Sequence, residues 1–175
     1  DGREKVTGVG RYTADLATTG MAHARFRYAD HPHARVLRID TARARALPGV
    51  VAVVTQEDLP EVRFGGLVQD RTLFAKDVVR FEGEIVAGVA ALTEAIAAEA
   101  ARLIEVEYEP LPVITDFVAA MEPDAPLVHA AWASYERDEN MVSNGNTLGY
   151  HTIVKGDADA ALAQADVVVG SRYES

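Results

Sequence analysis

Two stretches of the chain alternate between apolar and polar residues, which is the pattern of a half-buried β-strand. In residues 22–28 the apolar face is Ala22, Ala24, Phe26 and Tyr28, and the polar face is His23, Arg25 and Arg27. We predict a strand here with its apolar face in the core. In residues 104–109 the inner positions are Ile104, Val106 and Tyr108, and the outer positions are Glu105, Glu107 and Glu109. We predict a second strand over 104–108 with an acidic, solvated face.

Two other stretches, residues 50–54 and residues 85–92, are apolar without interruption. Such runs are typical of strands that are buried on both faces. The second run is rich in alanine and glycine, which permits neighbouring elements to approach closely. A less regular strand is expected through Val36, Leu37 and Ile39, after a turn at Asp30-His31-Pro32-His33, because proline restricts the residue before it and has no N–H.

Helices are predicted where capping residues precede helical spacing of apolar positions. Thr41 should cap a short helix over 42–47 that Pro48-Gly49 ends, and Thr93 should cap the longest helix, over 93–103. The apolar face expected for that helix is Ile96, Ala100, Leu103 and Ile104. Gly156-Asp157 should begin a short alanine-rich helix, followed by a strand at 166–170. Helix-then-strand units thus recur, which predicts a mixed α+β or α/β fold.

The remaining stretches are predicted to be irregular. Residues 58–70 form a loop, residues 121–147 a long surface excursion, and a strand is expected near 148–154. We expect the strands at 22–28, 50–54, 85–92 and 104–108 to share one core, on which the helix at 93–103 is packed. We also expect exposed apolar groups in the irregular parts, at Phe64, Leu67, Val68, Trp132 and Tyr135.

Composition excludes several classes of protein. The 175 residues are 49% hydrophobic and 25% charged, which is typical of a globular chain and not of a disordered one. There is no cysteine, so disulfides and thiolate-held zinc or iron–sulfur sites are excluded. The net charge of −10 argues against binding to a nucleic-acid backbone. Apolar runs fall far short of the roughly 20 residues that cross a bilayer.

No residue pattern in the sequence identifies a catalytic, cofactor-binding or metal-binding site. Asp30, His31 and His33 could hold a metal, but a lone H-x-H in a turn is more often structural. His129 and His151 have no ligand partner at helical spacing, and no G-x-S-x-G motif is present. Gly8-x-Gly10 lacks the third glycine and the preceding strand of a dinucleotide site. We therefore assign no catalytic, cofactor-binding or metal-binding residue.

Eight sequence blocks, in order over nearly the whole chain, resemble the large subunit of the molybdenum hydroxylases, the xanthine dehydrogenase and aldehyde oxidase family. They include Lys5-Val6-Thr7-Gly8, Arg11-Tyr12-Thr13-Ala14-Asp15, His31-Pro32-His33-Ala34-Arg35-Val36, Leu47-Pro48-Gly49-Val50, Val79-Arg80-Phe81-Glu82-Gly83-Glu84, Tyr108-Glu109-Pro110-Leu111-Pro112, Leu127-Val128-His129 and Gly156-Asp157-Ala158-Asp159-Ala160. The resemblance implies the α/β hammerhead fold. One departure is Ile85, where the family usually has proline after Gly-Glu.

The resemblance further implies a division into a hammerhead domain at 1–130 and an extension at 131–175 that leads into a molybdopterin-binding domain. The family's molybdopterin contacts, glycine-rich loops and catalytic glutamate come after this region, so none is carried onto these residues. We expect the N-terminal domain of a larger oxidoreductase that hydroxylates an aldehyde or N-heterocycle with oxygen from water. The alternative is a naturally short, non-catalytic binding or assembly module.

Cofactors and partners follow from the same resemblance. We expect no cofactor on residues 1–175, molybdopterin in the intact subunit, and iron–sulfur clusters and FAD in partner domains or subunits. The expected role of this chain is structural, as an interface to the molybdopterin-binding lobe and to the iron–sulfur and flavin partners. The chain begins at Asp1 with no leader sequence, so a trimmed start and a cytoplasmic location are expected. The substrate and the electron acceptor are not indicated.

Overall fold

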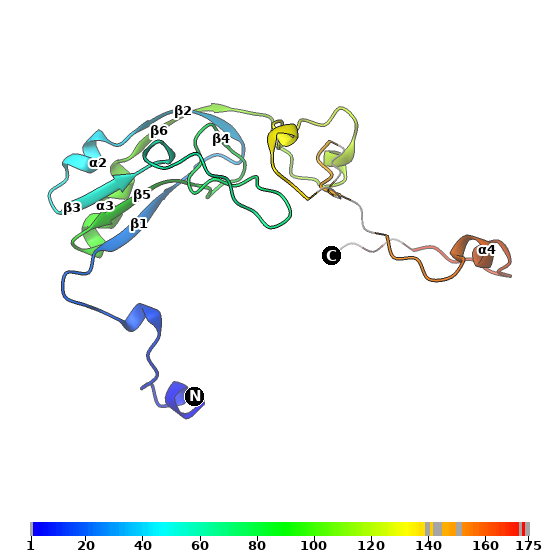
Figure 1. Cartoon of the computed structure of the whole chain (residues 1–175), viewed down its shortest axis with the longest axis horizontal. Helices are drawn as coiled ribbons and strands as arrows, with labels where there is room; N and C mark the ends of the chain where they lie inside the picture. Colours follow the sequence, from blue (N-terminus) through cyan, green and yellow to red (C-terminus); the bar gives the residue numbers. More distant parts are fainter. Residues whose placement is uncertain (1, 139–140, 142–144, 150–151, 172, 174–175) are drawn as a thin grey trace.

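Two small antiparallel sheets form the body of the protein in a computed structural model that describes residues 2–138, 141, 145–149, 152–171 and 173 (Figure 1). The first sheet has the order β1-β5-β3, and the second has the order β4-β2-β6. Their strands are β1 His23–Tyr28, β2 Ala34–Asp40, β3 Val50–Val54, β4 Val78–Val79, β5 Ile85–Ala91 and β6 Glu105–Pro110. The mixed α/β class that the sequence predicts is confirmed.

Strand β5 lies at the centre of the first sheet, where its small apolar residues meet neighbours on both sides. Ala87 and Val89 are buried on the face that carries the helices. On the opposite face, a Cβ added to Gly88 would lie 3.2 Å from the ring of Phe74 and 3.6 Å from that of Phe26. The absence of a side chain at this position therefore lets two aromatic rings approach the sheet closely.

Helix α3 (Glu94–Leu103) packs on the first sheet next to the short helix α2 (Ala42–Ala46). The Thr93 hydroxyl accepts a hydrogen bond from the backbone N–H of Ile96 at 3.2 Å, as the capping prediction requires. The buried face of the helix consists of Ala97, Ala100 and Ala101, and it continues into Ile104, the residue directly after the helix. Ile96 and Leu103 are only partly buried, so the predicted face is displaced from the observed one. Alanines at the contact allow the helix to lie close to the strands.

The expected cap of α2 is wrong. The Thr41 side chain makes no capping hydrogen bond; the Asp40 carboxylate accepts one instead, from the backbone N–H of Ala42 at 2.9 Å. The end of the helix is as predicted, since Gly49 adopts a φ of +90° after Pro48.

The predicted burial of β1 is inverted. Phe26 and Tyr28 are 42% and 48% exposed, whereas the arginine face contacts α3. Arg25 pairs with Glu94 in the first turn of that helix, and the Arg27 Nε donates to the carbonyl oxygen of Ile104 at its end, at 3.2 Å. Arginine can bury its aliphatic stem while its guanidinium binds a helix terminus, so alternation alone does not say which face is inside.

Strand β3 is an edge strand with one buried residue, Val53, so its predicted burial on both faces is wrong. Its neighbour β5 does have the predicted central position. The first hydrophobic cluster joins buried residues of α2, β3, β5 and α3 with Ile104, and Val106 of β6 packs against it. The expected common core is therefore confirmed for β3, β5 and α3, while no residue of β1 belongs to this cluster.

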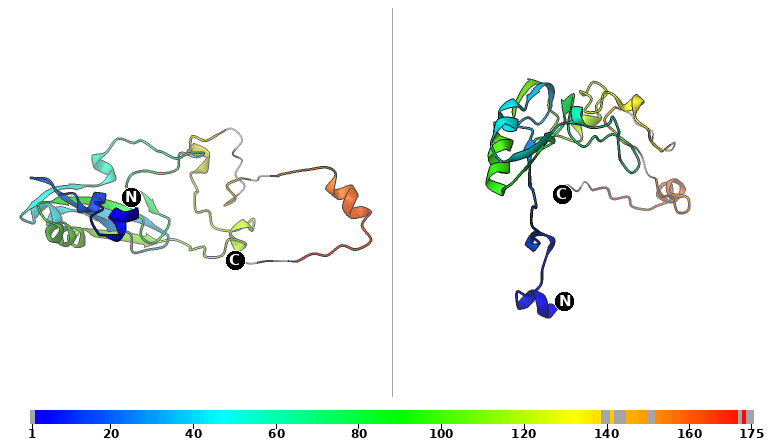
Figure 2. Two further views of the ribbon diagram at one scale, coloured as in Figure 1. Left: turned by 90° about the horizontal axis from the view of Figure 1, so that it is seen from below. Right: turned by 60° about the vertical axis from the view of Figure 1, so that its left-hand side comes forward.

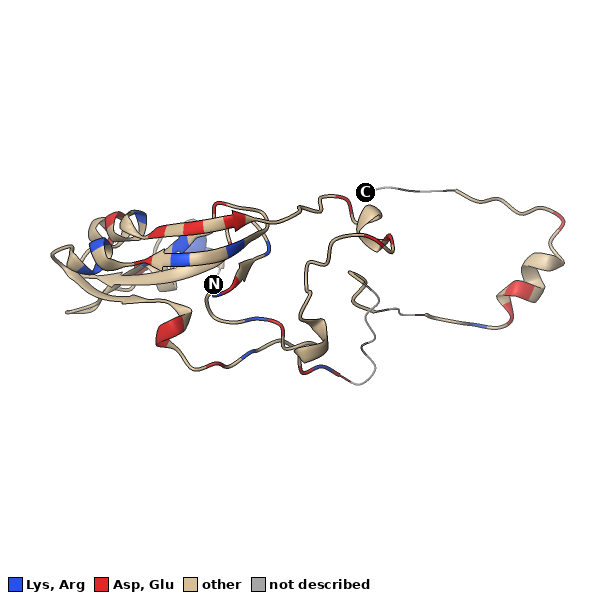
Figure 3. Cartoon of the chain, turned by 90° about the horizontal axis from the view of Figure 1, so that it is seen from above, with Lys and Arg blue, Asp and Glu red and all other residues tan. Residues whose placement is uncertain are grey.

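A second cluster lies where the two sheets meet, and consists of Ala29, Ala34, Ala75, Val79 and Val86. Alternation in β6 is as predicted, with Val106 and Tyr108 inward and the glutamates outward. Figure 3 shows acidic positions along β6 beside basic positions of β2. Two of the glutamates pair with arginines, Glu109 with Arg35 at 2.9 Å and Glu105 with Arg43 at 2.7 Å. These residues thus form a solvated charged surface and not a carboxylate site.

Outside the two sheets, α2 and α3, the helices of the described chain are short: α1 Gly2–Val6, α4 Ala158–Ala163, and the 3₁₀ turns η1 Thr13–Asp15, η2 Gln56–Asp58, η3 Ala119–Met121 and η4 Trp132–Ser134. Helix α4 begins as predicted, with the Asp157 carboxylate accepting from the N–H of Ala160 at 2.9 Å. The strands expected near 148–154 and at 166–170 do not form among the described residues; 150–151 lie outside them. No helix in the described part of the chain has the length and apolarity needed to cross a bilayer.

Candidate functional site

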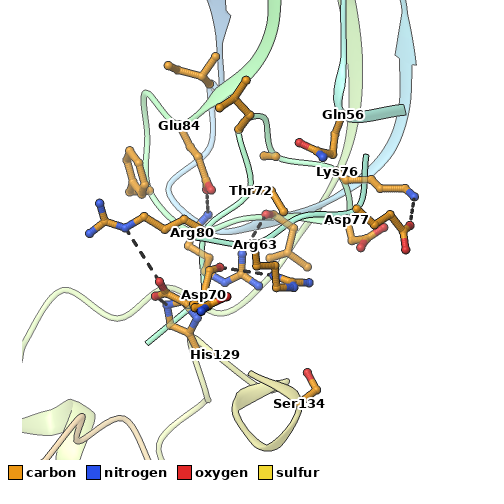
Figure 4. A pocket seen from close by; sticks show the side chains of 18 of the residues that line it. Gln56, Arg63, Asp70, Thr72, Lys76, Asp77, Arg80, Glu84, His129 and Ser134 are labelled. Atoms are coloured by element: carbon orange, nitrogen blue, oxygen red, sulfur yellow. Dashed lines mark hydrogen bonds and ion pairs between the residues drawn. The ribbon is translucent and has the colours of Figure 1, made fainter. Parts of the chain in front are cut away.

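A charged cleft of about 930 Å³ separates the irregular stretch after η2 from the segment around η4 (Figure 4). Ionisable side chains from distant parts of the sequence line it. The charged or titratable residues around it are Glu61, Arg63, Asp70, Arg71, Lys76, Asp77, Arg80, Glu84, His129 and Glu136. Both signs of charge are therefore present in one hollow.

A short hairpin positions one wall of the cleft. Phe64 and Arg71 form an isolated antiparallel bridge, with backbone N–H to carbonyl distances of 2.9 and 3.2 Å. Its outer edge pairs with a distant segment, because the N–H of Gln69 donates to the carbonyl of Glu136 at 2.8 Å and that of Asp138 to the carbonyl of Leu67 at 3.0 Å. The backbone thus fastens residues 136–138, the end of the segment 128–138, to the hairpin.

Tyr135 anchors that segment. It is 4% exposed, and the Arg63 guanidinium lies 5.1 Å from its ring centroid. The Trp132 ring meets it edge-on with centroids 6.4 Å apart, and Arg137 covers Trp132 in turn at 5.5 Å. The expected exposed patch is therefore found only in part: Tyr135 and Val68 are buried, while Phe64 and Leu67 are exposed.

His129 lies beside Asp70, which belongs to the hairpin (Figure 4). Its Nδ1 is 3.3 Å from the Tyr135 hydroxyl, and its Nε2 is 3.9 Å from an oxygen of Asp70. Burial lowers the pKa of His129, and the positive charge of Arg80 lowers it further, whereas Asp70 opposes both effects. The neutral ring is therefore favoured, and with its proton on Nε2 its Nδ1 can accept a hydrogen bond from the Tyr135 hydroxyl.

Glu84 and Arg80 form the opposite wall. The Glu84 carboxylate accepts a hydrogen bond from the backbone N–H of Arg80 at 2.6 Å. Burial raises the pKa of Glu84, and the N–H and charge of Arg80 offset part of that rise. The Arg80 guanidinium donates to the carbonyl of Val128 at 3.2 Å. Two hydrogen bonds thus connect Glu84 through Arg80 to the segment that contains His129.

The cations of the cleft are already engaged. Lys76 pairs with Glu61 at 3.2 Å, Arg71 with Asp70 at 4.0 Å, and Arg63 donates to the Asp70 carbonyl at 3.4 Å. Five carboxylates line the cleft among its four cations, and they would repel the phosphate of a cofactor such as molybdopterin, so these residues do not fit it. Among the described residues no three His, Asp or Glu side chains gather to hold a metal ion. The cleft is suited to polar contacts between segments.

The residues weighed as candidates from the sequence do not converge. Asp30 binds the Arg27 guanidinium through both oxygens, at 2.8 and 2.6 Å. The His33 Nδ1 is 2.6 Å from the carbonyl of Pro112. The ring of His31 packs against that of Tyr108 with centroids 4.7 Å apart. Gly8 and Gly10 lie in the N-terminal arm, and His151 lies outside the described residues.

Sequence reasoning weighed His129 as a metal ligand, found no ligand partner at helical spacing, and gave it no role. Asp70 is 59 positions earlier in the chain, and Tyr135 is brought into place by the backbone bridge to the hairpin. The only signal in the sequence was its place in the Leu127-Val128-His129 block of the family resemblance.

Protonation of His129 should loosen the segment that it holds. A pKa lowered on folding means that His129 stabilises the protein above its ordinary value of 6.5, and that this contribution is lost as the pH falls through the folded value. The difference in unfolding free energy between the wild type and His129→Gln should therefore shrink from pH 8 to pH 5. Fluorescence of Trp132, the only tryptophan, should report the same transition. A difference that stays constant over this range contradicts the assignment.

Comparisons with known proteins agree over most of the chain. Residues 7–112 match the family described as aldehyde oxidase and xanthine dehydrogenase, a/b hammerhead domain. The chain is 35% identical to a probable xanthine dehydrogenase subunit from Bacillus subtilis, over 99% of this chain and 22% of that protein. It is 33% identical to the xanthine dehydrogenase molybdenum-binding subunit of Escherichia coli O157:H7, over 100% of this chain and 23% of that protein.

A solved structure shows the same arrangement. Reconstituted CO dehydrogenase from Oligotropha carboxidovorans aligns with a TM-score of 0.77 and 36% identity, covering 95% of this chain and 21% of the solved chain. The chain thus spans less than a quarter of the length of each of these three proteins.

Proposed function

The chain belongs to the aldehyde oxidase and xanthine dehydrogenase family, whose a/b hammerhead domain it contains, and we propose that it is the N-terminal domain of a molybdenum hydroxylase large subunit. One observation carries this proposal. Nearly the whole chain aligns with part of proteins that are several times longer, and one of these proteins is a molybdenum-binding subunit. The intact protein would hydroxylate an aldehyde or an N-heterocycle with oxygen from water.

The proposed role of these residues is structural. The cations that line the charged cleft contact other groups of the chain, and apolar side chains are exposed on both terminal arms. We propose that residues 1–130 form the domain and that residues 131–175 lead into the molybdopterin-binding lobe. Molybdopterin would be held by that lobe, and iron–sulfur clusters and FAD by partner domains or subunits, in a cytoplasmic assembly. A bound cofactor would supply the redox chemistry, while this domain would position its neighbours.

The 175-residue chain alone should carry no cofactor. It has no cysteine for iron–sulfur ligation, and carboxylates outnumber cations in its cleft. We expect metal analysis of the purified chain to find molybdenum and iron far below one atom per chain, no flavin absorbance, and no oxidation of aldehydes or purines. Stoichiometric molybdenum or iron after gel filtration contradicts the proposal.

The function itself is tested on the natural polypeptide. Its mass, measured on protein from the source cells, should greatly exceed 18.8 kDa, and it should contain molybdenum. With ¹⁸O-labelled water, the product formed from an aldehyde or an N-heterocycle should carry the label. A natural polypeptide of 18.8 kDa without molybdenum would instead favour the alternative, a short non-catalytic module of the same fold.

A further inference from the structure

Residues 152–170 carry a complete helix-then-strand pattern, but their apolar residues are not buried. Helix α4 has no buried residue, and Ile153 is 85% exposed. The valines that follow the helix, Val167, Val168 and Val169, are 77%, 63% and 84% exposed. Three consecutive β-branched residues favour a strand, and such a run is seldom left in water.

Residues 152–170 lack the sheet on which the other helix-then-strand units of the protein pack. In the body, α2 is followed by β3 and α3 by β6, and each strand joins a sheet. The alanines of α3 are buried on a sheet, whereas those of α4 are not buried. Figures 1 and 2 show α4 standing apart from both sheets.

The backbone of the valine run is also unpaired. The Ala165 N–H donates to the carbonyl of Leu162 at 3.3 Å, and beyond it no backbone hydrogen bond joins residues 166–170 to another described residue. A strand-prone run with open N–H and carbonyl groups on both edges is complete only beside another strand.

We infer that residues 166–170 are a β-strand that pairs with the edge of a sheet in the remainder of the same subunit, with α4 packed on that sheet. This inference rests on the proposed function. The solved CO dehydrogenase chain aligns with 95% of this chain at a TM-score of 0.77, so the alignment with a chain more than four times as long includes extended residues as well as the body. A covalently attached sheet also has the advantage of high effective concentration over a second copy.

Hydrogen exchange on the natural polypeptide tests the inference directly. Amides of residues 166–170 should exchange at unprotected rates in the 175-residue chain, and about 100-fold or more slowly in the intact subunit. Unprotected amides in an intact, molybdenum-containing subunit overturn the inference but leave the proposed function standing. A natural chain of 18.8 kDa overturns the proposed function first. Protection in the 175-residue chain that rises with its concentration identifies a second copy as the partner and also overturns the inference.

Two proline variants supply an independent test. Adjacent residues of a strand direct their N–H groups to opposite edges, so at least one of Val167→Pro and Val168→Pro must remove a ladder hydrogen bond. That variant should lower the melting temperature of the intact subunit, while Val168→Thr, which keeps the N–H and the branched side chain, should not. Neither proline should change the melting temperature of the 175-residue chain. A drop in that chain would show that the run belongs to its own fold, and would refute the inference.

Discussion

Replacing Ile104 with alanine is expected to lower the free energy of unfolding by about 2–5 kcal/mol. Ile104 is 2% exposed and is among the largest fully buried side chains of the protein. It follows α3 directly and lies in the cluster with the alanines of that helix and with Ala87 and Val89 of β5. Backbone elements enclose the site closely, so the cavity would collapse only partly.

Ile96→Ala is the matched control, because it removes the same atoms from a position that is only partly buried. Urea unfolding followed by circular dichroism should show a clearly smaller loss for Ile96→Ala than for Ile104→Ala. The reverse order would mean that the core buries Ile96 more deeply than Ile104. Two near-neutral results would mean that the helix is not part of the core.

The elements with strong local signals were predictable. A threonine cap, ten residues without proline or glycine and a following alternation suffice for α3 and β6. The run that forms β5 is apolar on both faces, and in the structure it lies between two strands with a helix on one side. In each case the information needed lies within about ten residues of sequence.

Long-range contacts decided the cases that were not predictable. Alternation in β1 shows two faces, but the Arg27 stem lies against α3 because the carbonyl of Ile104, 77 residues away, accepts its hydrogen bond. The apolar run of β3 has the sequence of a central strand, and yet no strand of the described residues forms beside its outer edge. His129 acquired its setting in the same way, from Asp70 and from the hairpin that holds Tyr135.

The strand predicted at residues 166–170 is a different kind of failure. The local pattern is strong, since Val167 to Val169 are all β-branched, but a strand is defined by a partner. None of the described residues provides one. A pattern can therefore be interpreted correctly and still form no strand in the part of the polypeptide that carries it.

Replacing Gly65 with alanine should detach residues 128–138 from the hairpin. A Cβ at Gly65 would overlap the carbonyl oxygen of Val68, and this backbone atom cannot yield as a flexible side chain would. The hairpin must therefore open at the residues that pair with Glu136 and Asp138. We expect a cost of about 1–3 kcal/mol, red-shifted and more readily quenched fluorescence of Trp132, and faster amide exchange over 128–138.

Gly66→Ala is the control for the neighbouring position. Nothing lies within 4 Å of a Cβ added at Gly66, and its φ is not positive, so this variant should match the wild type in fluorescence and exchange. Because both glycines lie in the same loop, a general effect of stiffening the chain would appear in both variants. A change in Gly65→Ala alone would show that the close approach to Val68 holds the hairpin shut. If Trp132 is unaffected in both, the segment is held by Tyr135 and its ring contacts and not by the backbone bridge.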